Sequence, residues 1–267
     1  MSSLPVILHV PHSGRLIPEA YRKDFLLDDA ALSAEIACMT DHGTDVLFMA
    51  PNAPFQSLIV PWSRLLVDVE RFADDEQEVM SRQGMGVLYE KTSDGRSLRN
   101  QLSPARRAEL LAATYESHHQ KLTTLVDETL ARHGHCLIID CHSFPREALP
   151  YEDASQHRPQ ICLGTDPFHT CPELVDHFRQ AYEAAGFDVG INTPFAGSLV
   201  PLKHYHQDER VQSIMIEVRR DLYIEQISSN EVIYDSVAVH RLQQLASSAI
   251  HDAIAVLERS IVRHRPL

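Results

Sequence analysis

The stretch from Leu137 to Pro145 reads LIIDCHSFP, an unbroken apolar run that ends in polar residues. A run without polar alternation is typical of a strand covered on both faces, as in a parallel or mixed sheet. Ligands of such α/β proteins bind beyond the carboxyl ends of the strands. The stretch therefore predicts a buried strand with His142 at the edge of a sheet. Taken alone, one histidine there would more often be a structural residue than a ligand.

Two other apolar runs end in the same way. Residues 6–12 read VILHVPH, and residues 213–220 read SIMIEVRR, in which Glu217 has apolar neighbours. Pro11 and the glycine that follows in PHSGRLIP require a loop after the first run, so His12 is expected just past a strand end. Three strands would then bring two histidines and one carboxylate to the same edge.

The remaining pattern alternates short apolar runs with helical periodicity. Further strands are predicted at 57–60, 65–69 and 161–164, and helices at 28–39, 45–49, 103–134, 172–185 and 236–258. Alternating strands and helices favour an α/β fold, a three-layer αβα sandwich with a mixed central sheet. We expect residues 1–267 to form a single domain. Residues 74–103 show weak periodicity and are expected to be a long excursion that could act as a lid over a site.

Composition narrows the classes of function. The 267 residues are 44% hydrophobic and carry a net charge of −13, which argues against a surface for nucleic acid or anionic membrane. The five cysteines are scattered without a CxxC pair, which argues against a disulfide framework and a thiolate zinc site. The start of the chain has no basic signal region and the sequence has no long apolar span, so we expect a cytoplasmic protein. The sequence carries no signal for oligomeric state.

The local signatures of serine hydrolases, nucleotide-binding loops and HExxH zinc proteases are missing from the sequence. A zinc ion held by two imidazoles and a carboxylate needs no thiolates and can be assembled from distant segments. His12, Asp45 and His142 meet that requirement. Other residues compete for these positions: His9 with His12, and Asp41 and His42 with Asp45.

Glu217 is the most informative carboxylate of the sequence. An apolar setting would raise its pKa and suit it to general-base catalysis. The alternative is a buried structural ion pair with Arg219 or Arg220, which follow it closely.

With these residues in view, the chain resembles the N-formylglutamate amidohydrolase family along almost its whole length. The resembling segments are VPHSGRLIP at 10–18, DHGTDVLF at 41–48, SRLLVDVERF at 63–72, LIIDCHSFP at 137–145, NTPFAGSLV at 192–200 and IEVRRDLY at 216–223. More distantly, the family is similar to zinc carboxypeptidases and aspartoacylases, in which a strand ending in His-Ser supplies a metal ligand and a later Glu next to Arg is the base. His142, Ser143 and Glu217 match those positions.

The resemblance implies a zinc-carboxypeptidase-like fold and a metal-dependent enzyme. It would split N-formyl-L-glutamate into formate and L-glutamate, a late step of histidine breakdown, with one Zn²⁺ or another divalent metal per chain. Glu217 would be the base for the attacking water. The substrate, a small N-acyl amino acid, would be bound by the residues Arg64, Arg71, Arg220, Asn192, Gly197 and His119.

Two departures from the resembling families affect these expectations. Carboxypeptidases have a Glu three residues after the first histidine ligand, but Arg15 follows His12 at that distance, so Asp45 is the expected carboxylate ligand. In addition, Glu70 and Arg219 stand where the family usually has Asn in Asp-x-Asn-Arg and Glu-x-Asn-Arg motifs. These replacements leave open a related metallohydrolase that acts on another N-acyl amino acid or a peptide-like amide. A metal-free binding protein with the same fold is the non-enzymatic alternative.

Overall fold

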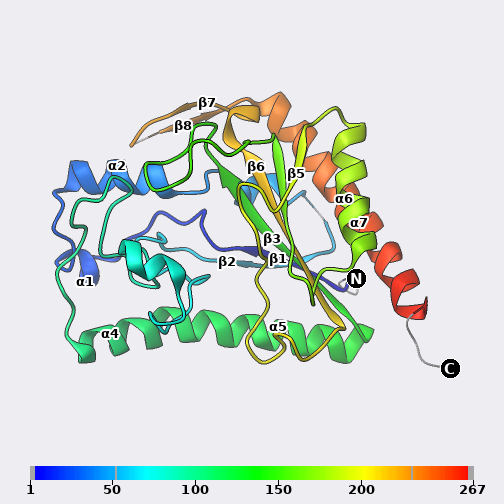
Figure 1. The fold of residues 1–267 in the computed structure, drawn as a ribbon, viewed down its shortest axis with the longest axis horizontal. Coiled ribbons are helices and arrows are strands. Elements are labelled where there is room, and N and C mark those ends of the chain that lie inside the picture. Colours follow the sequence, from blue (N-terminus) through cyan, green and yellow to red (C-terminus); the bar gives the residue numbers. More distant parts are fainter. Residues whose placement is uncertain (1–3, 52, 230, 264–267) are drawn as a thin grey trace.

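The computed structural model describes residues 4–263 except 52 and 230, so the ends of the predicted 1–267 domain lie outside the described residues. Within that part of the chain, one six-stranded sheet has the order β2-β1-β3-β6-β4-β5 (Figure 1). Its strands are β1 Val6–Val10, β2 Gln56–Ile59, β3 Cys136–Phe144, β4 Ile161–Gly164, β5 Val189–Ile191 and β6 Val211–Arg219. Neighbouring strands are parallel, except that β4 runs antiparallel to β6. The prediction of a mixed sheet is confirmed.

The apolar run that contains His142 forms β3, at the centre of this sheet. Every residue of β3 is buried, and β3 pairs with β1 on one side and with β6 on the other. These are the three apolar runs of the sequence, so all three strand predictions are confirmed. The register places His142 directly beside Glu217 and Asp140 beside His9.

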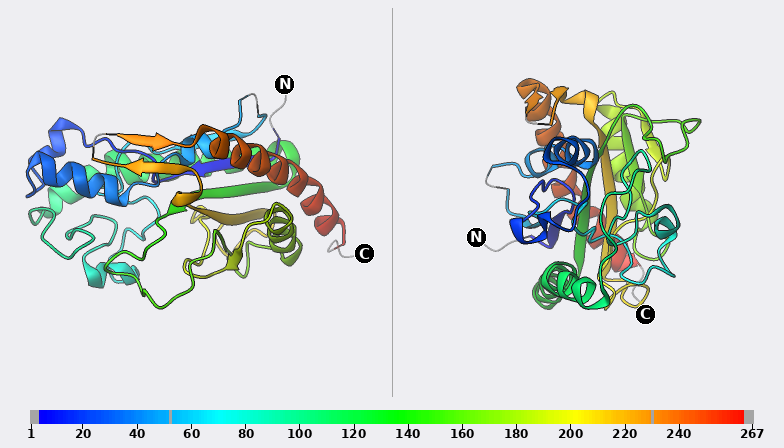
Figure 2. Two further views of the ribbon diagram at one scale, coloured as in Figure 1. Left: turned by 90° about the horizontal axis from the view of Figure 1, so that it is seen from above. Right: turned by 90° about the vertical axis from the view of Figure 1, so that its left-hand side faces the viewer.

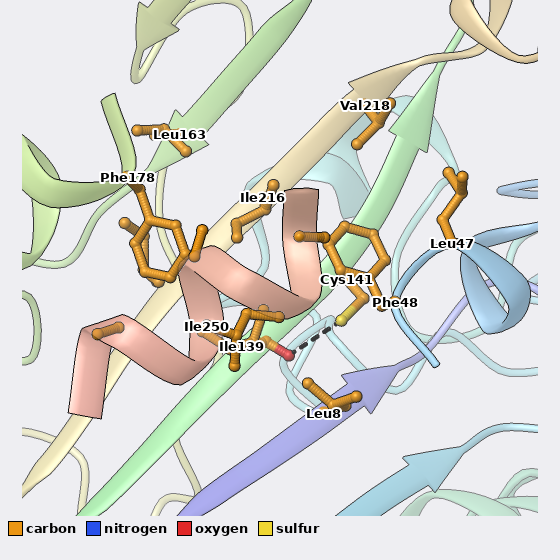
Figure 3. Packing of buried hydrophobic residues seen from close by; sticks show 14 of the residues in the cluster. Leu8, Leu47, Phe48, Ile139, Cys141, Leu163, Phe178, Ile216, Val218 and Ile250 are labelled. Atoms are coloured by element: carbon orange, nitrogen blue, oxygen red, sulfur yellow. Dashed lines mark hydrogen bonds between the residues drawn. The ribbon is translucent and has the colours of Figure 1, made fainter. Parts of the chain in front are cut away.

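One face of the sheet is covered by two helices, α6 Pro172–Ala184 and α7 Ser236–Arg263, and by the short α3 Thr44–Leu47 (Figure 1). Ile139 and Cys141 of β3, Ile216 of β6 and Leu8 of β1 point to this side, where Phe178 and Ile250 of the helices fill the space between them (Figure 3). Burial of these side chains supplies the main apolar stabilisation of the sheet.

The opposite face packs against one long helical segment. It consists of α4 Pro104–Leu111, a π-helical turn η2 Ala112–Glu116 and α5 Ser117–His133. It begins as predicted, because the Ser103 hydroxyl accepts a hydrogen bond from the Arg106 amide. It ends at Gly134, whose positive φ of 79° suits a helix C-terminus. Leu122 and Val126 of α5 contact Ile7 and Ile138 of the sheet, which completes three layers.

A second hydrophobic cluster lies beyond the carboxyl ends of β1 and β3, next to α1 Glu19–Arg22 and α2 Asp29–Met39 (Figures 1 and 2). Residues 74–103, with the 3₁₀ helix η1 Val79–Gln83, belong to this region and contribute buried side chains such as Val87 and Tyr89. The segment is therefore packed core over part of its length. That it moves as a lid stays a prediction.

The strand predicted at 65–69 is wrong. These residues form turns and irregular structure, although Leu65, Leu66 and Val67 are buried in the second cluster. Their backbone groups are bonded elsewhere: the Arg99 guanidinium donates to the carbonyls of Leu65 and Leu66, and the Asp68 amide donates to the Val87 carbonyl. Apolar periodicity could not distinguish a buried turn from a buried strand.

The chain closes with the 3₁₀ helix η3 Arg220–Leu222 and an antiparallel hairpin of β7 Ile224–Ile227 and β8 Val232–Tyr234, which lead into α7. The cysteines at positions 38, 136, 141, 162 and 171 are free thiols. Among the helices of the described chain, none has the length and apolar character needed to cross a membrane.

Candidate metal and hydrolytic site

The polar residues of the central strands share one face of the sheet. Side chains alternate along a strand, and Ile7 and Ile138 point toward α5. His9, Asp140 and His142 follow at even spacing, so they project to the same side, at the carboxyl edge of the sheet. Glu217 projects there from β6, beside His142.

Two histidines at this edge are each backed by a carboxylate. His142 donates from Nδ1 to Asp41 Oδ2 over 3.0 Å, and its Nε2 lies 3.2 Å from Glu70 Oε1. His12 donates from Nε2 to Asp68 Oδ1 over 2.9 Å, and its Nδ1 lies 3.5 Å from Glu70 Oε2. A carboxylate on the far nitrogen is the usual support of a metal-binding imidazole.

The electrostatics of this cluster are dominated by buried carboxylates. Burial alone would lower the pKa of His142, but Glu70, Asp140 and Asp41 outweigh it and raise that pKa well above its ordinary value. Burial would likewise raise the pKa of Asp41, yet the charges of His12 and His142 and the hydrogen bond from His142 bring that pKa well below its usual range. The cluster therefore attracts positive charge.

The residues present fit a divalent metal. One ligand atom from each of His12, Glu70 and His142 lies within 4.8 Å of the others. Ligands held about 2.1 Å from a tetrahedral zinc ion are roughly 3.4 Å apart, close to the separations between Glu70 and the two imidazoles. The Nδ1 atom of His12 is buried and has no hydrogen-bond partner among the described residues, which leaves its lone pair for a cation.

The structure does not support the predicted metal ligand Asp45. It is exposed in the first turn of α3, where a helix N-terminus favours an acidic residue, and it is not part of the cluster. Asp41 and Glu70 each lie within 4.0 Å of both histidines, Asp68 lies beside His12, and Asp140 lies beside His142. The competing candidate His42 is also elsewhere, because its Nε2 donates to the Ala37 carbonyl over 2.7 Å.

Glu217 lies in the setting that the sequence predicted. Burial raises its pKa from 4.5 to about 8, even though the charge on His142 opposes the shift. Its Oε2 atom is buried and lacks a hydrogen-bond partner within the described chain. Glu217 lines a cavity of about 640 Å³, together with His12, Glu70 and His142. It therefore has a free oxygen and a pKa near neutrality, as a general base requires.

The three predicted arginines all line this cavity but differ in what they have left to offer. Arg64 donates twice to Asp68 Oδ2, over 3.2 and 2.8 Å. Arg220 donates to Asp41, to the Cys38 carbonyl, and to both the hydroxyl and the carbonyl of Ser143. Arg71 has only loose contacts, 3.7 Å to Asp68 and 3.9 Å to Glu78, and its side chain is 26% exposed. Arg71 is thus the arginine with donors to spare for a substrate.

The weaker substrate-binding candidates divide between the cavity and the surface. His119 and Gly197 line the cavity. His119 donates to the Val69 carbonyl, and burial lowers its pKa to about 4, so it is neutral. Asn192 is exposed and both ends of its amide are bonded to Thr165, so the structure does not bring it to the cavity. Asn192 and Gly197 belong to the same glycine- and proline-containing loop, and the sequence did not indicate which end of that loop faces the cavity.

Sequence reasoning did not assign roles to Glu70, Asp68 and Arg158. Arg158 lies over the rings of Phe144 and Phe195, donates to Glu152 over 2.8 Å and lines the cavity. Asp68 interrupts the apolar run at 65–69 and Glu70 follows it, a pattern like the polar end of the run that contains His142. That pattern was the available signal for both carboxylates.

A family profile and one solved structure point to the same family. The sequence profile described as N-formylglutamate amidohydrolase matches residues 4–224. The fold is similar to that of N-formylglutamate amidohydrolase from Ralstonia eutropha JMP134, with a TM-score of 0.81, 20% identity and coverage of 97% of this chain and 96% of that one. It is also similar to gene product Atu2144 from Agrobacterium tumefaciens, with a TM-score of 0.70, 19% identity and coverage of 95% and 92%. A search of curated proteins found no match.

The raised pKa of Glu217 predicts a pH-dependent contribution to the stability of the metal-free protein. Between pH 4.5 and about 8, folded Glu217 holds a proton that the unfolded chain has released. Its contribution is therefore complete below pH 4.5 and is lost as the pH rises to about 8. We expect the unfolding free energy of wild type to fall more steeply over this range than that of Glu217→Gln, by up to about 1.4 kcal/mol per pH unit.

Urea unfolding in the presence of a chelator at several pH values measures the two slopes. The exposed Glu225→Gln on β7 is the control and should keep the wild-type slope. Equal slopes in wild type and Glu217→Gln would contradict the assigned pKa.

Proposed function

Because the chain belongs to the N-formylglutamate amidohydrolase family, we propose that it hydrolyses N-formyl-L-glutamate to formate and L-glutamate in a metal-dependent reaction. The observation that carries the proposal is that Glu217, with one oxygen that lacks a partner among the described residues, shares a single cavity with the two carboxylate-backed imidazoles of His12 and His142. A place in histidine breakdown and a cytoplasmic location stay predictions from the resemblance.

His12, His142 and Glu70 would hold the metal, with Asp68 and Asp41 orienting the two imidazoles. Asp41 is the alternative third ligand, because its Oδ2 lies 3.8 Å from His12 Nδ1 and 3.0 Å from His142 Nδ1. Glu70 is preferred because Arg220 and the Ser143 amide already bond to Asp41. When bound, Zn²⁺ or a similar ion would polarise the formyl carbonyl of the substrate and lower the pKa of a bound water from about 15.7 toward about 7.

Glu217 would handle the proton of the reaction. Its carboxylate takes a proton from water as the water oxygen bonds to the formyl carbon, and it returns that proton to the amide nitrogen as the carbon–nitrogen bond breaks. Formate and the free amine of glutamate leave. With a pKa of about 8, Glu217 accepts and releases a proton readily near neutral pH, and a neighbouring cation would favour its carboxylate form.

Arg71 would bind a carboxylate of the substrate. Its guanidinium lines the cavity, and its Nε is buried without a hydrogen-bond partner in the described structure. A planar guanidinium pairs with a carboxylate through two parallel hydrogen bonds. Arg64 stands behind it as the partner of Asp68 and fixes the carboxylate that orients His12.

One observation favours the alternative substrate class. Arg64 and Arg220 are already engaged by protein groups, and aromatic side chains such as Tyr115, Tyr151 and Phe195 line the cavity. One open arginine beside an aromatic wall also suits an N-acyl amino acid with a single carboxylate. A panel of formyl and acetyl amino acids with acidic and apolar side chains distinguishes the two classes.

Substitution Glu217→Gln should lower kcat by about 10²- to 10⁴-fold, because the amide cannot accept the proton of water. Bound metal should stay at the wild-type level, which elemental analysis would check. The exposed Glu225→Gln is the matched control and should retain full activity. Turnover near the wild-type value in metal-loaded Glu217→Gln would refute the general base.

Substitution Arg71→Ala should raise KM for N-formyl-L-glutamate about 10- to 100-fold, because a charge-assisted pair to a carboxylate contributes about 1.5–3 kcal/mol. KM for a formyl amino acid amide without a carboxylate should change little. Arg179→Ala on the exposed side of α6 serves as the control. Equal changes for charged and neutral substrates would remove Arg71 from the carboxylate site.

A further inference from the structure

A second group of potential metal ligands lies next to the proposed centre. One ligand atom from each of His9, Glu70 and Asp140 lies within 4.8 Å of the others. His9 Nδ1 is 2.8 Å from Asp140 Oδ1 and 3.7 Å from Glu70 Oε1. His9 is fully buried and Asp140 is 2% exposed, so these groups meet away from bulk water.

Glu70 belongs to both groups, and its Oε1 atom lies between an imidazole of the first group and one of the second. Oε1 is 3.2 Å from His142 Nε2 and 3.7 Å from His9 Nδ1, whereas Oε2 is 3.5 Å from His12 Nδ1. A carboxylate that reaches ligands of both groups is placed to bridge two cations. In known two-metal hydrolytic sites such ions are about 3.5–4 Å apart.

The surroundings of His9 and Asp140 support them as ligands. The Nε2 atom of His9 is 3.0 Å from Nε2 of His118 on α5, which can accept the Nε2 proton and leave Nδ1 of His9 with a lone pair. In the other tautomer Nδ1 donates to Asp140 Oδ1 over 2.8 Å, and a cation bound between the two atoms would replace that proton. The Leu199 amide donates to Asp140 Oδ2 over 3.1 Å and fixes the orientation of that carboxylate.

We propose that His9, Asp140 and Glu70 bind a second divalent cation, with Glu70 bridging it to the first. Mixed imidazole and carboxylate ligands suit Zn²⁺, Mn²⁺ or Co²⁺. The second positive ion would also balance the buried carboxylates Asp41, Asp68 and Asp140 and the partly buried Glu70, which together outnumber the adjacent arginines Arg64, Arg71 and Arg220. The inference rests on the metal centre of the proposed function, because Glu70 is shared.

The test uses full-length protein that has been saturated with Mn²⁺ and then freed of unbound metal. Two quantities are measured: the number of ions per chain and the electron paramagnetic resonance spectrum. Wild type should bind two ions per chain and give the spectrum of a spin-coupled pair. His9→Gln and the isosteric Asp140→Asn should each bind one ion and give an uncoupled Mn²⁺ spectrum. The exposed His157→Gln is the matched control and should keep two ions.

Each other outcome overturns the inference in a distinguishable way. One ion in saturated wild type leaves the first centre and removes the second, whereas no ion removes both. Two coupled ions retained by both His9→Gln and Asp140→Asn would show that the second ion binds elsewhere. A fall from two ions in wild type to one ion in these variants supports the second site, even if the protein does not hydrolyse N-formyl-L-glutamate. Failure of the proposed substrate is therefore distinguished from failure of the second metal site.

Discussion

The structure depends on how it compensates negative charge that is buried at the carboxyl edge of its sheet. Asp41, Asp68 and Asp140 are each at most 3% exposed. Their hydrogen-bond partners are His142, His12 and His9, respectively. Removing ionised carboxylates from water is costly unless cations or hydrogen-bond donors compensate for it. Arg64 and Arg220 compensate for Asp68 and Asp41. The imidazoles of His9 and His142 lie beside Asp140 and Glu70, and the proposed divalent cation would compensate for the rest of that charge.

The fold delivers these groups from two different kinds of structure. The central strands β1, β3 and β6 place His9, Asp140, His142 and Glu217 by register, so their spacing is fixed by backbone hydrogen bonds. Asp68, Glu70 and Arg71 come instead from a turn region held in the second hydrophobic cluster by Leu65, Leu66 and Val67. The rigid sheet thus holds His9, Asp140, His142 and the proposed base Glu217, whereas packed turns hold Asp68, Glu70 and the proposed substrate-binding Arg71.

This division explains what could be predicted from the sequence. His12, His142 and Glu217 lie in or just after long apolar runs, and a buried strand has one well-defined carboxyl end, so their convergence could be predicted. The position of Glu70, the proposed carboxylate ligand, could not be predicted. Glu70 reaches the histidines through long-range packing between the segments 65–69 and 74–103. Asp45 had the right residue type in the right segment, but the turn at Gly43 directs α3 away, leaving Asp41 near the site. Asn192 was misplaced in the same way, since one end of its loop faces the cavity and the other does not.

The most direct measurement of the central claim is formate release from N-formyl-L-glutamate by protein that has been stripped of metal and then reloaded with Zn²⁺. The site geometry predicts negligible formate from the stripped protein and full turnover after metal is restored, because His12, His142 and Glu70 form a cation site beside Glu217. Formate release that is indifferent to chelator would contradict the metal site. Absence of formate from the fully reloaded protein would contradict the proposed substrate.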